Sequence, residues 1–431
     1  MYPSTYAFSG DFAYPGDKTT VGISQQRMRI IQLPLQNSKM HIRRVEQLED
    51  LLVYQQRWDE LAGDCVFRSW TWLFTWWKHY AAVGDSRQLS VLLVFDDSLE
   101  SCNCTRKASS CRNIESLGFR PPHTLVGILP CYLEATRWQG NVLRLLGDGE
   151  VCSEHLDLLC VECHADRVAE AVARYLNAHA TAWDAWHVDT IREDSTQLSK
   201  IFTHLKRCGA HICRKKGANC WSIRLPATWE EFLAMQSKSH RKQLRRLESR
   251  VLESDRAHWQ LVESQAEFVG AWEALIELHQ RRRKSLNQPG CFASELWGKF
   301  HRDVAQQLLE TGHLRLSVLN LDKQPIAAEY HFAGNKALFV YQGGLDPDRC
   351  DEEPGKLSMI RCVQQAIAEG QLEFDLLRGD EPYKPHWRAV QFPTMDIQVV
   401  SPRTTARLRH FSANSLRNVG RITNQFANLL G

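Results

Sequence analysis

Apolar positions along this chain follow two kinds of spacing, and each predicts one type of element. Between Glu46 and Tyr80, leucines and tryptophans recur every three or four residues, which predicts two or three helices with a heavy aromatic load. Shorter apolar runs bounded by Gly, Pro, Asn or Ser predict strands. The strands expected in the first half are 88–95, 124–133, 141–146, 155–161, 185–191 and two more between 211 and 225. The helices expected there are 166–178 and 196–208.

The second half repeats this order of elements. Helices at 267–283 and 293–311 are followed by strands at 314–321, 325–332 and 337–343, a helix at 356–369, a strand at 372–377 and a last strand around 395–400. Two successive runs of helices, strand meander, helix and strand favour tandem copies of one α/β unit. We therefore expect a disordered arm at 1–40, a first domain at 41–227 with an insertion at 96–122, and a second domain at 257–401.

Two basic segments flank the second domain. Residues 228–256 begin with Thr228 and Glu231 in capping-box spacing and are expected to form one exposed connecting helix. Its apolar stripe is Leu244, Leu247 and Val251. Its basic residues are Lys238, Arg241, Lys242, Arg245, Arg246 and Arg250. Residues 402–431 are expected to form a basic amphipathic terminal helix.

Composition sets limits on partners and surroundings. The chain has 431 residues, 43% of them hydrophobic, which is enough apolar mass for two cores. Its net charge of +3 is too small to argue for DNA as a partner. We expect no membrane span, because no apolar run reaches the length that one needs. Fourteen scattered cysteines favour free thiols in a reducing, cytoplasmic location.

The densest chemistry lies near the end of the chain. A strand there leads into a loop of acids, bases and aromatics, which are Asp375, Arg378, Asp380, Tyr383, Lys384 and Trp387. Upstream, Pro354, Gly355 and Lys356 begin a predicted helix, and a helix N-terminus can hold an anion. The combination indicates group transfer from a phosphate-bearing donor.

These residues also carry a resemblance. The second half resembles the GNAT-type acyltransferase domain of the CelD-like family, named for cellulose-biosynthesis loci and related to the tandem-GNAT Fem peptidyltransferases. The motifs that carry it are Ser239-x-Arg241-x-x-Leu244-Arg245-Arg246, Pro354-Gly355, Ala366 to Gly370, and Phe374-Asp375 through Arg378-Gly379-Asp380-Glu381-x-Tyr383-Lys384-x-x-Trp387. Weaker echoes in the first half are Gly127-Ile-Leu-Pro130, Leu143-Arg-Leu-Leu-Gly147 and His155-Leu-Asp157. The implied fold is α/β, with tandem GNAT-like domains that each hold a mixed, mostly antiparallel sheet flanked by helices.

The resemblance implies where a donor binds. In a GNAT-type fold a splayed strand presents backbone amides to the thioester carbonyl, and the next helix offers its N-terminus to the pyrophosphate. The residues that would bind the donor are then Gly343, Gly344, Pro354, Gly355, Lys356 and Arg378. An ordinary loop and helix start is the alternative, and the acidic Asp351, Glu352 and Glu353 are poorly placed for a pyrophosphate.

Transfer to an amine needs a base and an acid. Asp375 and Glu329 interrupt apolar strands, so either is a candidate general base, or else a member of a structural ion pair. By resemblance to Fem-type enzymes, Tyr383 would protonate the leaving thiolate, and Lys384 would stabilise the oxyanion or bind a phosphate. The predicted acceptor contacts are Tyr341, Arg241, Arg245 and Trp387, although packing would also account for Trp387 and a solvated surface for the arginines.

Two cysteine patterns suggest other chemistry. Residues 160–164, Cys-Val-Glu-Cys-His, match a haem-attachment pattern. Zinc binding by Cys152, His155, Cys160 and Cys163 is a further alternative, but the spacing is irregular. We predict no metal and no permanently bound cofactor.

The sequence predicts an N-acyltransferase that uses acyl-CoA, or another activated carrier, as co-substrate. The acceptor would be an amine on a sugar, an amino acid or a cell-envelope or polysaccharide precursor. A Fem-like enzyme that uses aminoacyl-tRNA, partnership with an acyl carrier protein, and a non-catalytic GNAT-like binding protein stay open as alternatives.

Overall fold

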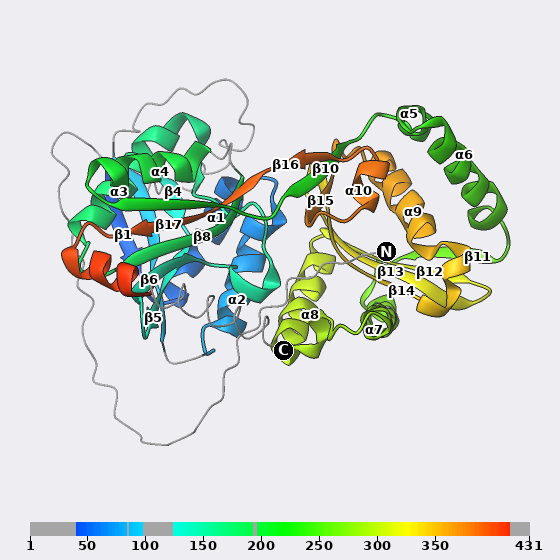
Figure 1. Cartoon of the computed structure of the whole chain (residues 1–431), viewed down its shortest axis with the longest axis horizontal. Helices are drawn as coiled ribbons and strands as arrows, with labels where there is room; N and C mark the ends of the chain where they lie inside the picture. Colours follow the sequence, from blue (N-terminus) through cyan, green and yellow to red (C-terminus); the bar gives the residue numbers. More distant parts are fainter. Residues whose placement is uncertain (1–39, 84–85, 98–123, 193–195, 414–431) are drawn as a thin grey trace, which may run out of the picture.

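The computed structural model describes residues 40–83, 86–97, 124–192 and 196–413. Its chain forms two α/β halves that lie side by side (Figure 1). Most of the predicted arm, most of the predicted insertion and the last 18 residues of the predicted terminal helix lie outside the described residues.

The first half contains nine strands and four α-helices among the described residues. The strands are β1 (Met40–Val45), β2 (Arg87–Leu89), β3 (Val91–Asp96), β4 (Thr124–Leu129), β5 (Cys131–Thr136), β6 (Gly140–Leu145), β7 (Leu159–Cys160), β8 (Ala185–Arg192) and β9 (His211–Lys216). The helices are α1 (Gln55–Ala62), α2 (Trp70–Tyr80), α3 (Ala165–Ala178) and α4 (Thr196–Arg207).

The rest of the chain supplies the following elements. The strands are β10 (Cys220–Arg224), β11 (Ala257–Leu261), β12 (Leu314–Leu321), β13 (Gln324–Ala333), β14 (Ala337–Leu345), β15 (Glu373–Arg378), β16 (Val390–Phe392) and β17 (Thr394–Val400). The helices are α5 (Trp229–Met235), α6 (Lys238–Leu247), α7 (Gln265–Ser285), α8 (Glu295–Glu310), α9 (Pro354–Ala368) and α10 (Tyr383–His386).

The two halves share one strand order. The second sheet runs β11-β12-β13-β14-β15-β10-β16, and the first half forms two sheets, β1-β3-β4-β7 and β2-β5-β6-β8-β17-β9. Breaks at Ser90, Pro130 and 146–158 separate β2 from β3, β4 from β5 and β6 from β7. When each broken pair is counted as one strand, the orders coincide, and β6–β8 and β14–β15 are the equivalent parallel pairs.

Each half includes one strand that lies outside its predicted domain. β10 lies between β15 and β16 in the second sheet, although we placed it in the first domain. β17 lies between β8 and β9 in the first half, so the prediction that it completes the second domain is wrong. The register explains the exchange, because Val399 and Ile397 of β17 are buried in the core of the first half.

Helices cover both faces of the second sheet, with α7 and α8 on one and α9 on the other (Figure 1). On the α7 side, one apolar cluster joins the halves: Phe67 and Trp72 of the first half contact Phe332 and Tyr341 of the second. On the α9 side, a separate cluster also takes in α5 and α6. The halves therefore share a core as well as strands.

The basic connection is not one helix. Thr228 and Glu231 do form the predicted capping box of α5. However, α5 ends at Met235 and Ser237 caps a new helix, α6, by accepting a hydrogen bond from the His240 N–H. A π-helical turn at Glu248–Leu252 follows. The predicted stripe of Leu244, Leu247 and Val251 is buried.

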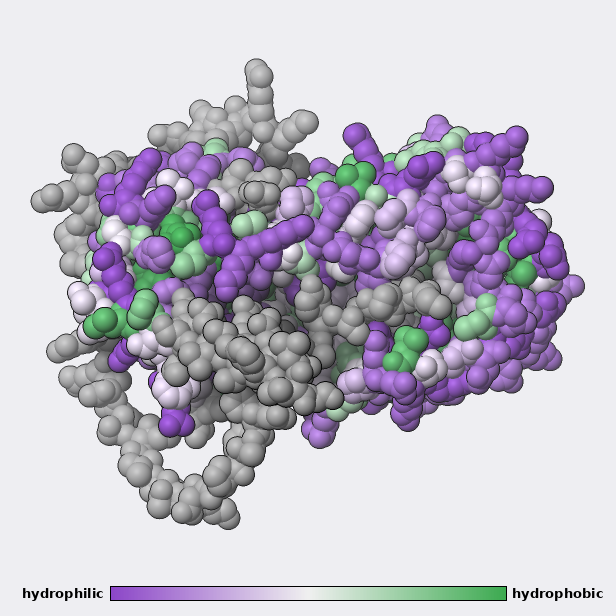
Figure 2. Space-filling view, in the orientation of Figure 1, coloured by the Kyte–Doolittle hydropathy of each residue, from purple (hydrophilic) through white to green (hydrophobic). Residues whose placement is uncertain are grey.

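Polar side chains dominate the visible surface, with small scattered apolar patches (Figure 2). In the part of the chain that the structure describes, no helix combines the length and the apolar character needed to cross a bilayer. The described part of the terminal segment, helical at 404–413, leaves Leu408 and Phe411 exposed. Its Arg403 and Arg409 instead bind Asp184.

The strand exchange makes a testable prediction. A chain that ends after Phe392 lacks β17, so β8 and β9 lose their shared partner and their amides should exchange hydrogen at least tenfold faster, on the order of 1.4 kcal/mol of lost protection. Hydrogen-exchange mass spectrometry measures this. A chain that ends after Ala413 keeps β17 and serves as the control. Equal protection in the two chains would contradict the borrowed strand.

Candidate functional site

The candidate site lies where β14 and β15 part. They pair in parallel only over Ala337–Phe339 and Glu373–Asp375. A β-bulge at Tyr341 shifts the β13–β14 register, and a second bulge beside Leu377 shifts the β10–β15 register. Bulges bend and twist strands, so the two strands diverge immediately after their paired segment.

Lys384 holds the bulged end of β15. Its Nζ lies 2.9 Å from the carbonyl oxygens of Arg378 and Gly379 and 3.3 Å from that of Leu377. The same atom lies 2.8 Å from a carboxylate oxygen of Glu381. These acceptors use the three N–H donors of a buried ammonium group, so the predicted oxyanion role of Lys384 has no free donor in this arrangement.

A loop of the first half enters this region. Residues 146–158 interrupt the strand that β6 begins, and we had assigned 155–161 to a strand, which is wrong except for β7. Within the loop, His155 Nε2 lies 2.8 Å from Asp375 Oδ2. Glu154 pairs with Arg378. No local pattern predicts the His155–Asp375 contact, because it joins residues 220 positions apart.

Electrostatics favour a charged His155. Burial alone would lower its pKa, but the adjacent Asp375 carboxylate and, less strongly, Glu154 together raise it above the ordinary 6.5. The pKa of Arg378 is raised as well: burial alone would lower it, but the adjacent Glu154 carboxylate raises it. Arg378, predicted to bind donor phosphate, is thus engaged by the first half.

Tyr341 lies at the β14 bulge and heads a polar chain. Its hydroxyl donates to the Val151 carbonyl oxygen at 2.5 Å, also from the first-half loop, and lies 3.0 Å from His301 Nε2. Because the Tyr341 hydroxyl donates its proton to Val151, its oxygen accepts a hydrogen bond from His301 Nε2–H. The other ring nitrogen of His301, Nδ1, then lies 3.3 Å from the Tyr330 hydroxyl. Burial lowers the pKa of His301 and raises that of Tyr341, so both are neutral.

Glu329 lies on the opposite face of the sheet from Asp375. It accepts a hydrogen bond of 2.6 Å from Ser358 of α9, and His331 Nε2 lies 3.2 Å away. Asp375 is paired with Phe339 and faces the first half. The two predicted bases are therefore separated by the sheet, and Glu329 is enclosed under α9.

Glycine at 343 and 344 is required by close packing. A Cβ on Gly343 would lie 2.6 Å from Glu329 Oε2, and one on Gly344 would lie 2.5 Å from the backbone N of His279 in α7. Glu353, at the start of α9, adopts a left-handed backbone with φ 57°. These features fix the path from the β14 bulge to the α9 N-terminus.

Counter-charges occupy the acidic approach to α9. Glu352 pairs with Arg256 and Arg349. Glu353 pairs with Lys356 and accepts a hydrogen bond of 2.9 Å from Gln243. Although partial burial opposes it, the Lys356 charge lowers the pKa of Glu353. Two of the three acids that argue against a phosphate site, Glu352 and Glu353, are thus paired with neighbouring cations.

Four further predicted residues lie on or near the α9 side of the second sheet or in α6. Tyr383 packs against the apolar cluster on the α9 side. Trp387 is 3% exposed and packs against Phe232 in a tilted contact and against His240 edge to face, which is a packing position. Arg241 is half-buried and Arg245 is exposed, paired with Glu230.

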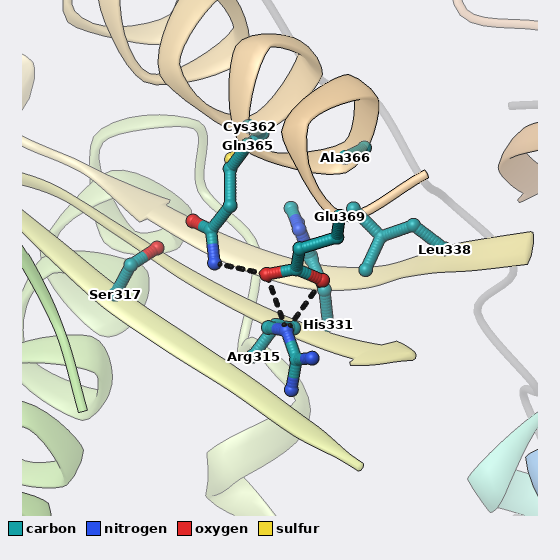
Figure 3. Close-up of a pocket in the computed structure, with 8 residues that line it drawn as sticks. All are labelled: Arg315, Ser317, His331, Leu338, Cys362, Gln365, Ala366 and Glu369. Carbon is teal, nitrogen blue, oxygen red and sulfur yellow. Dashed lines mark hydrogen bonds and ion pairs between the residues drawn. The ribbon is translucent and has the colours of Figure 1, made fainter. Parts of the chain in front are cut away.

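The cysteines and possible metal ligands can be assessed in the described part of the chain. Every cysteine in the described ranges is free. Within those ranges no three His, Cys, Asp or Glu side chains gather as metal ligands. A cavity of about 10 Å³ beneath α9, beside His331 and the Arg315–Glu369 ion pair (Figure 3), has room for about one water. It is too small for a substrate.

The role of Lys384 predicts a loss of stability on substitution. Lys384→Met leaves three carbonyls and Glu381 without their buried partner, so the free energy of unfolding should fall by about 3 kcal/mol. Urea titration measures it. Lys299→Met, at an exposed ion pair, is the matched control and should change stability by less than about 1 kcal/mol. Similar values for both variants would refute the clamp.

The His155–Asp375 pair predicts a pH-dependent stability difference. Because the folded pKa of His155 is raised, its stabilisation is full below the unfolded value and is lost as pH rises through the folded value. His155→Gln should therefore cost about 2 kcal/mol near pH 6 and less at pH 9, by urea titration. His258→Gln, at an exposed site, should show no such trend. A cost that is the same at both pH values would contradict the charged pair.

One family description matches part of the chain. Residues 238–385 match the family described as "Acetyltransferase (GNAT) domain". The match covers about a third of the sequence and spans α6 through the start of α10, including β14, β15 and α9. No curated protein matches the chain significantly.

Solved structures resemble most of the chain at low identity. FemX matches with a TM-score of 0.52 and 8% identity, over 80% of this chain and 95% of that one. A conserved protein of unknown function from Bacteroides thetaiotaomicron matches with a TM-score of 0.48 and 9% identity, over 83% and 99%. A tandem GNAT protein from the clavulanic acid biosynthesis pathway matches with a TM-score of 0.40 and 10% identity, over 84% and 99%.

At these identities the similarity is one of fold, and only the FemX score is high enough to support it. Together with the duplicated strand order, it confirms the predicted α/β fold of tandem GNAT-like domains. The protein therefore consists of two GNAT-like units, and the second carries the recognised GNAT domain.

Proposed function

We propose that the protein is an N-acyltransferase whose second unit moves an acyl group from acyl-CoA, or another activated carrier, to an amine. The observation that carries the proposal is the parting of β14 and β15 beside the start of α9, within the segment that matches the GNAT domain. Beyond Phe339, β14 has no strand partner on its β15 side in the described residues. Backbone groups on that edge are available to a thioester donor.

The donor phosphates would bind at the N-terminus of α9. Gly355 and Lys356 lie in its first turn, where backbone N–H groups and the helix dipole favour an anion. Positive side chains gather beside it: burial lowers the pKa of His240, and the nearby charges of Lys356, His386 and Arg388 lower it further. Mutual repulsion among these groups would be relieved by a bound polyanion.

The second unit is the better candidate for the active centre. In the first unit, β6 ends at Leu145 and the chain leaves the sheet until β7. The loop between them runs to Asp375 and Arg378 of the second unit. The first unit thus lacks a continuous strand equivalent to β14 and contributes to the site of the other.

The proposal extends to the chemistry of the acceptor and of the donor. The acceptor would be an amine on a sugar, an amino acid or an envelope or polysaccharide precursor, as the CelD-like resemblance implies, in the cytoplasm. The exposed basic side chains of α6 also suit a carrier protein or aminoacyl-tRNA as donor, and strongly salt-dependent RNA binding would favour the latter.

A non-catalytic binding protein is the competing function. The contacts of His155 and Glu154 with β15 occupy the mouth of the site in this arrangement. Calorimetric titration with acetyl-CoA and longer acyl-CoAs separates the two functions. Heat of binding with turnover supports the transferase, whereas no binding of any thioester would refute the proposed donor site.

Charge reversal at the α9 N-terminus provides a further prediction. Lys356→Glu should weaken acyl-CoA binding about tenfold, equivalent to about 1.4 kcal/mol, because it removes an attraction to phosphate and adds a repulsion. The dissociation constant from calorimetry measures this effect. Lys206→Glu, at an exposed position of α4, should leave binding unchanged. An unaffected Lys356 variant would place the phosphates elsewhere.

A further inference from the structure

Contacts with both units hold the first-half loop in place on the N-terminal side of His155. Val151 accepts from the Tyr341 hydroxyl. The Ser153 hydroxyl accepts from Trp72 Nε1 at 2.8 Å, and Glu154 pairs with Arg378. His155 itself has a left-handed backbone, with φ 58°. This conformation is strained for a residue with a Cβ, so the surrounding contacts force it.

The ring of His155 is oriented by a carboxylate that is itself oriented. Asp375 Oδ1 accepts the Leu377 N–H at 2.8 Å, and Oδ2 faces His155 Nε2 at 2.8 Å. A neutral imidazole then donates Nε2–H to Asp375 and keeps the lone pair on Nδ1. The His155 side chain is 17% exposed against 8% for Asp375. The imidazole is therefore the more accessible member of the pair, and it is ordinarily the stronger base.

We propose that His155 of the first unit is the general base for acyl transfer at the second unit, with Asp375 as its positioning residue. This inference rests on the proposed function. It assigns the proton-accepting role to a residue that the GNAT match, confined to 238–385, does not contain. The paired units would then be needed together, since one provides the donor site and the other provides the base.

Acyl transfer would proceed through a tetrahedral adduct. The amine nitrogen attacks the thioester carbonyl carbon, a C–N bond forms, and one proton of the amine passes to His155 Nδ1. The tetrahedral adduct collapses as the C–S bond breaks and its electron pair leaves on sulfur. The proton held by His155 balances the protonation of the thiolate, so amide and free thiol are the products.

Several ionisable groups face His155 and set its pH response. Asp375 on β15 and Glu154 in its own loop favour the imidazolium, whereas Arg192 at the end of β8 opposes it. Arg378 binds Glu154, and the Cys220 thiol of β10 lies 3.7 Å from the same carboxylate. Burial and, less strongly, the Asp375 charge raise the pKa of the Cys65 thiol. These contacts predict a rate that rises with pH through a His155 step above 6.5, beside the step at which the amine acceptor itself loses a proton.

The test uses the full chain and acetyl-CoA, with glucosamine, alaninamide or water as acceptor. Free CoA is followed by chromatography, because exposed thiols such as Cys152 and Cys163 would react with a thiol dye. His155→Gln should bind acetyl-CoA with unchanged affinity and release CoA on the order of 100-fold more slowly. The His155 step of the pH–rate profile should disappear in this variant, including with water as acceptor, while the step of the amine acceptor stays. In Asp375→Asn, the step should move to lower pH, and His258→Gln is the matched control.

The outcomes separate the inference from the proposed function. Wild-type turnover and pH profile in His155→Gln would overturn the base while leaving the transferase intact. Absence of acetyl-CoA binding to the wild type would overturn both. ¹⁵N-histidine spectra give a readout without an acceptor: the Nε2–H tautomer for His155, with a pKa that falls in Asp375→Asn, is expected. An Nδ1–H tautomer would overturn the proposal, because Nδ1 could not then accept the proton.

Discussion

Parallel pairing between β14 and β15 stops beyond Phe339 and Asp375. The proposed site depends on this separation of the two strands. Two bulges bend the strands apart, and Lys384 gathers the carbonyl oxygens that the bulge in β15 turns away from its neighbours. Without a buried cation those carbonyls would be left unpaired at a cost of several kcal/mol. The separation is thus built into the backbone and does not depend on a ligand.

The two units cannot be considered as independent modules. Each sheet completes itself with a strand from beyond the predicted boundary, β10 in one and β17 in the other. Aromatic side chains of α2 and of the short turn before it pack directly on the sheet of the second unit. Rigid coupling of this kind can position a side chain of one unit within hydrogen-bond distance of the other, as the His155–Asp375 contact requires.

Polar residues on the two faces of the second sheet have different roles. Glu329, His331 and Ser358 form a buried network under α9, which steadies the helix whose N-terminus faces the proposed donor phosphates. Asp375 and Tyr341 lie on the other face, in contact with the first unit. An acceptor that reaches the thioester from the first-unit side would meet the second set and not the first.

The sequence by itself determined most of the elements, the duplication and the chemistry-rich end of the chain. Apolar spacing revealed α7 to α9 and β12 to β15, and the capping box at Thr228 marked the start of α5. Local patterns carry this information because helix and strand periods are properties of neighbouring residues. Tertiary structure alone decided that Lys384 is a clamp, that Glu329 and Asp375 lie on opposite faces, and that His155 reaches Asp375. These relations depend on strand register and on contacts between residues far apart in sequence, which no local period encodes.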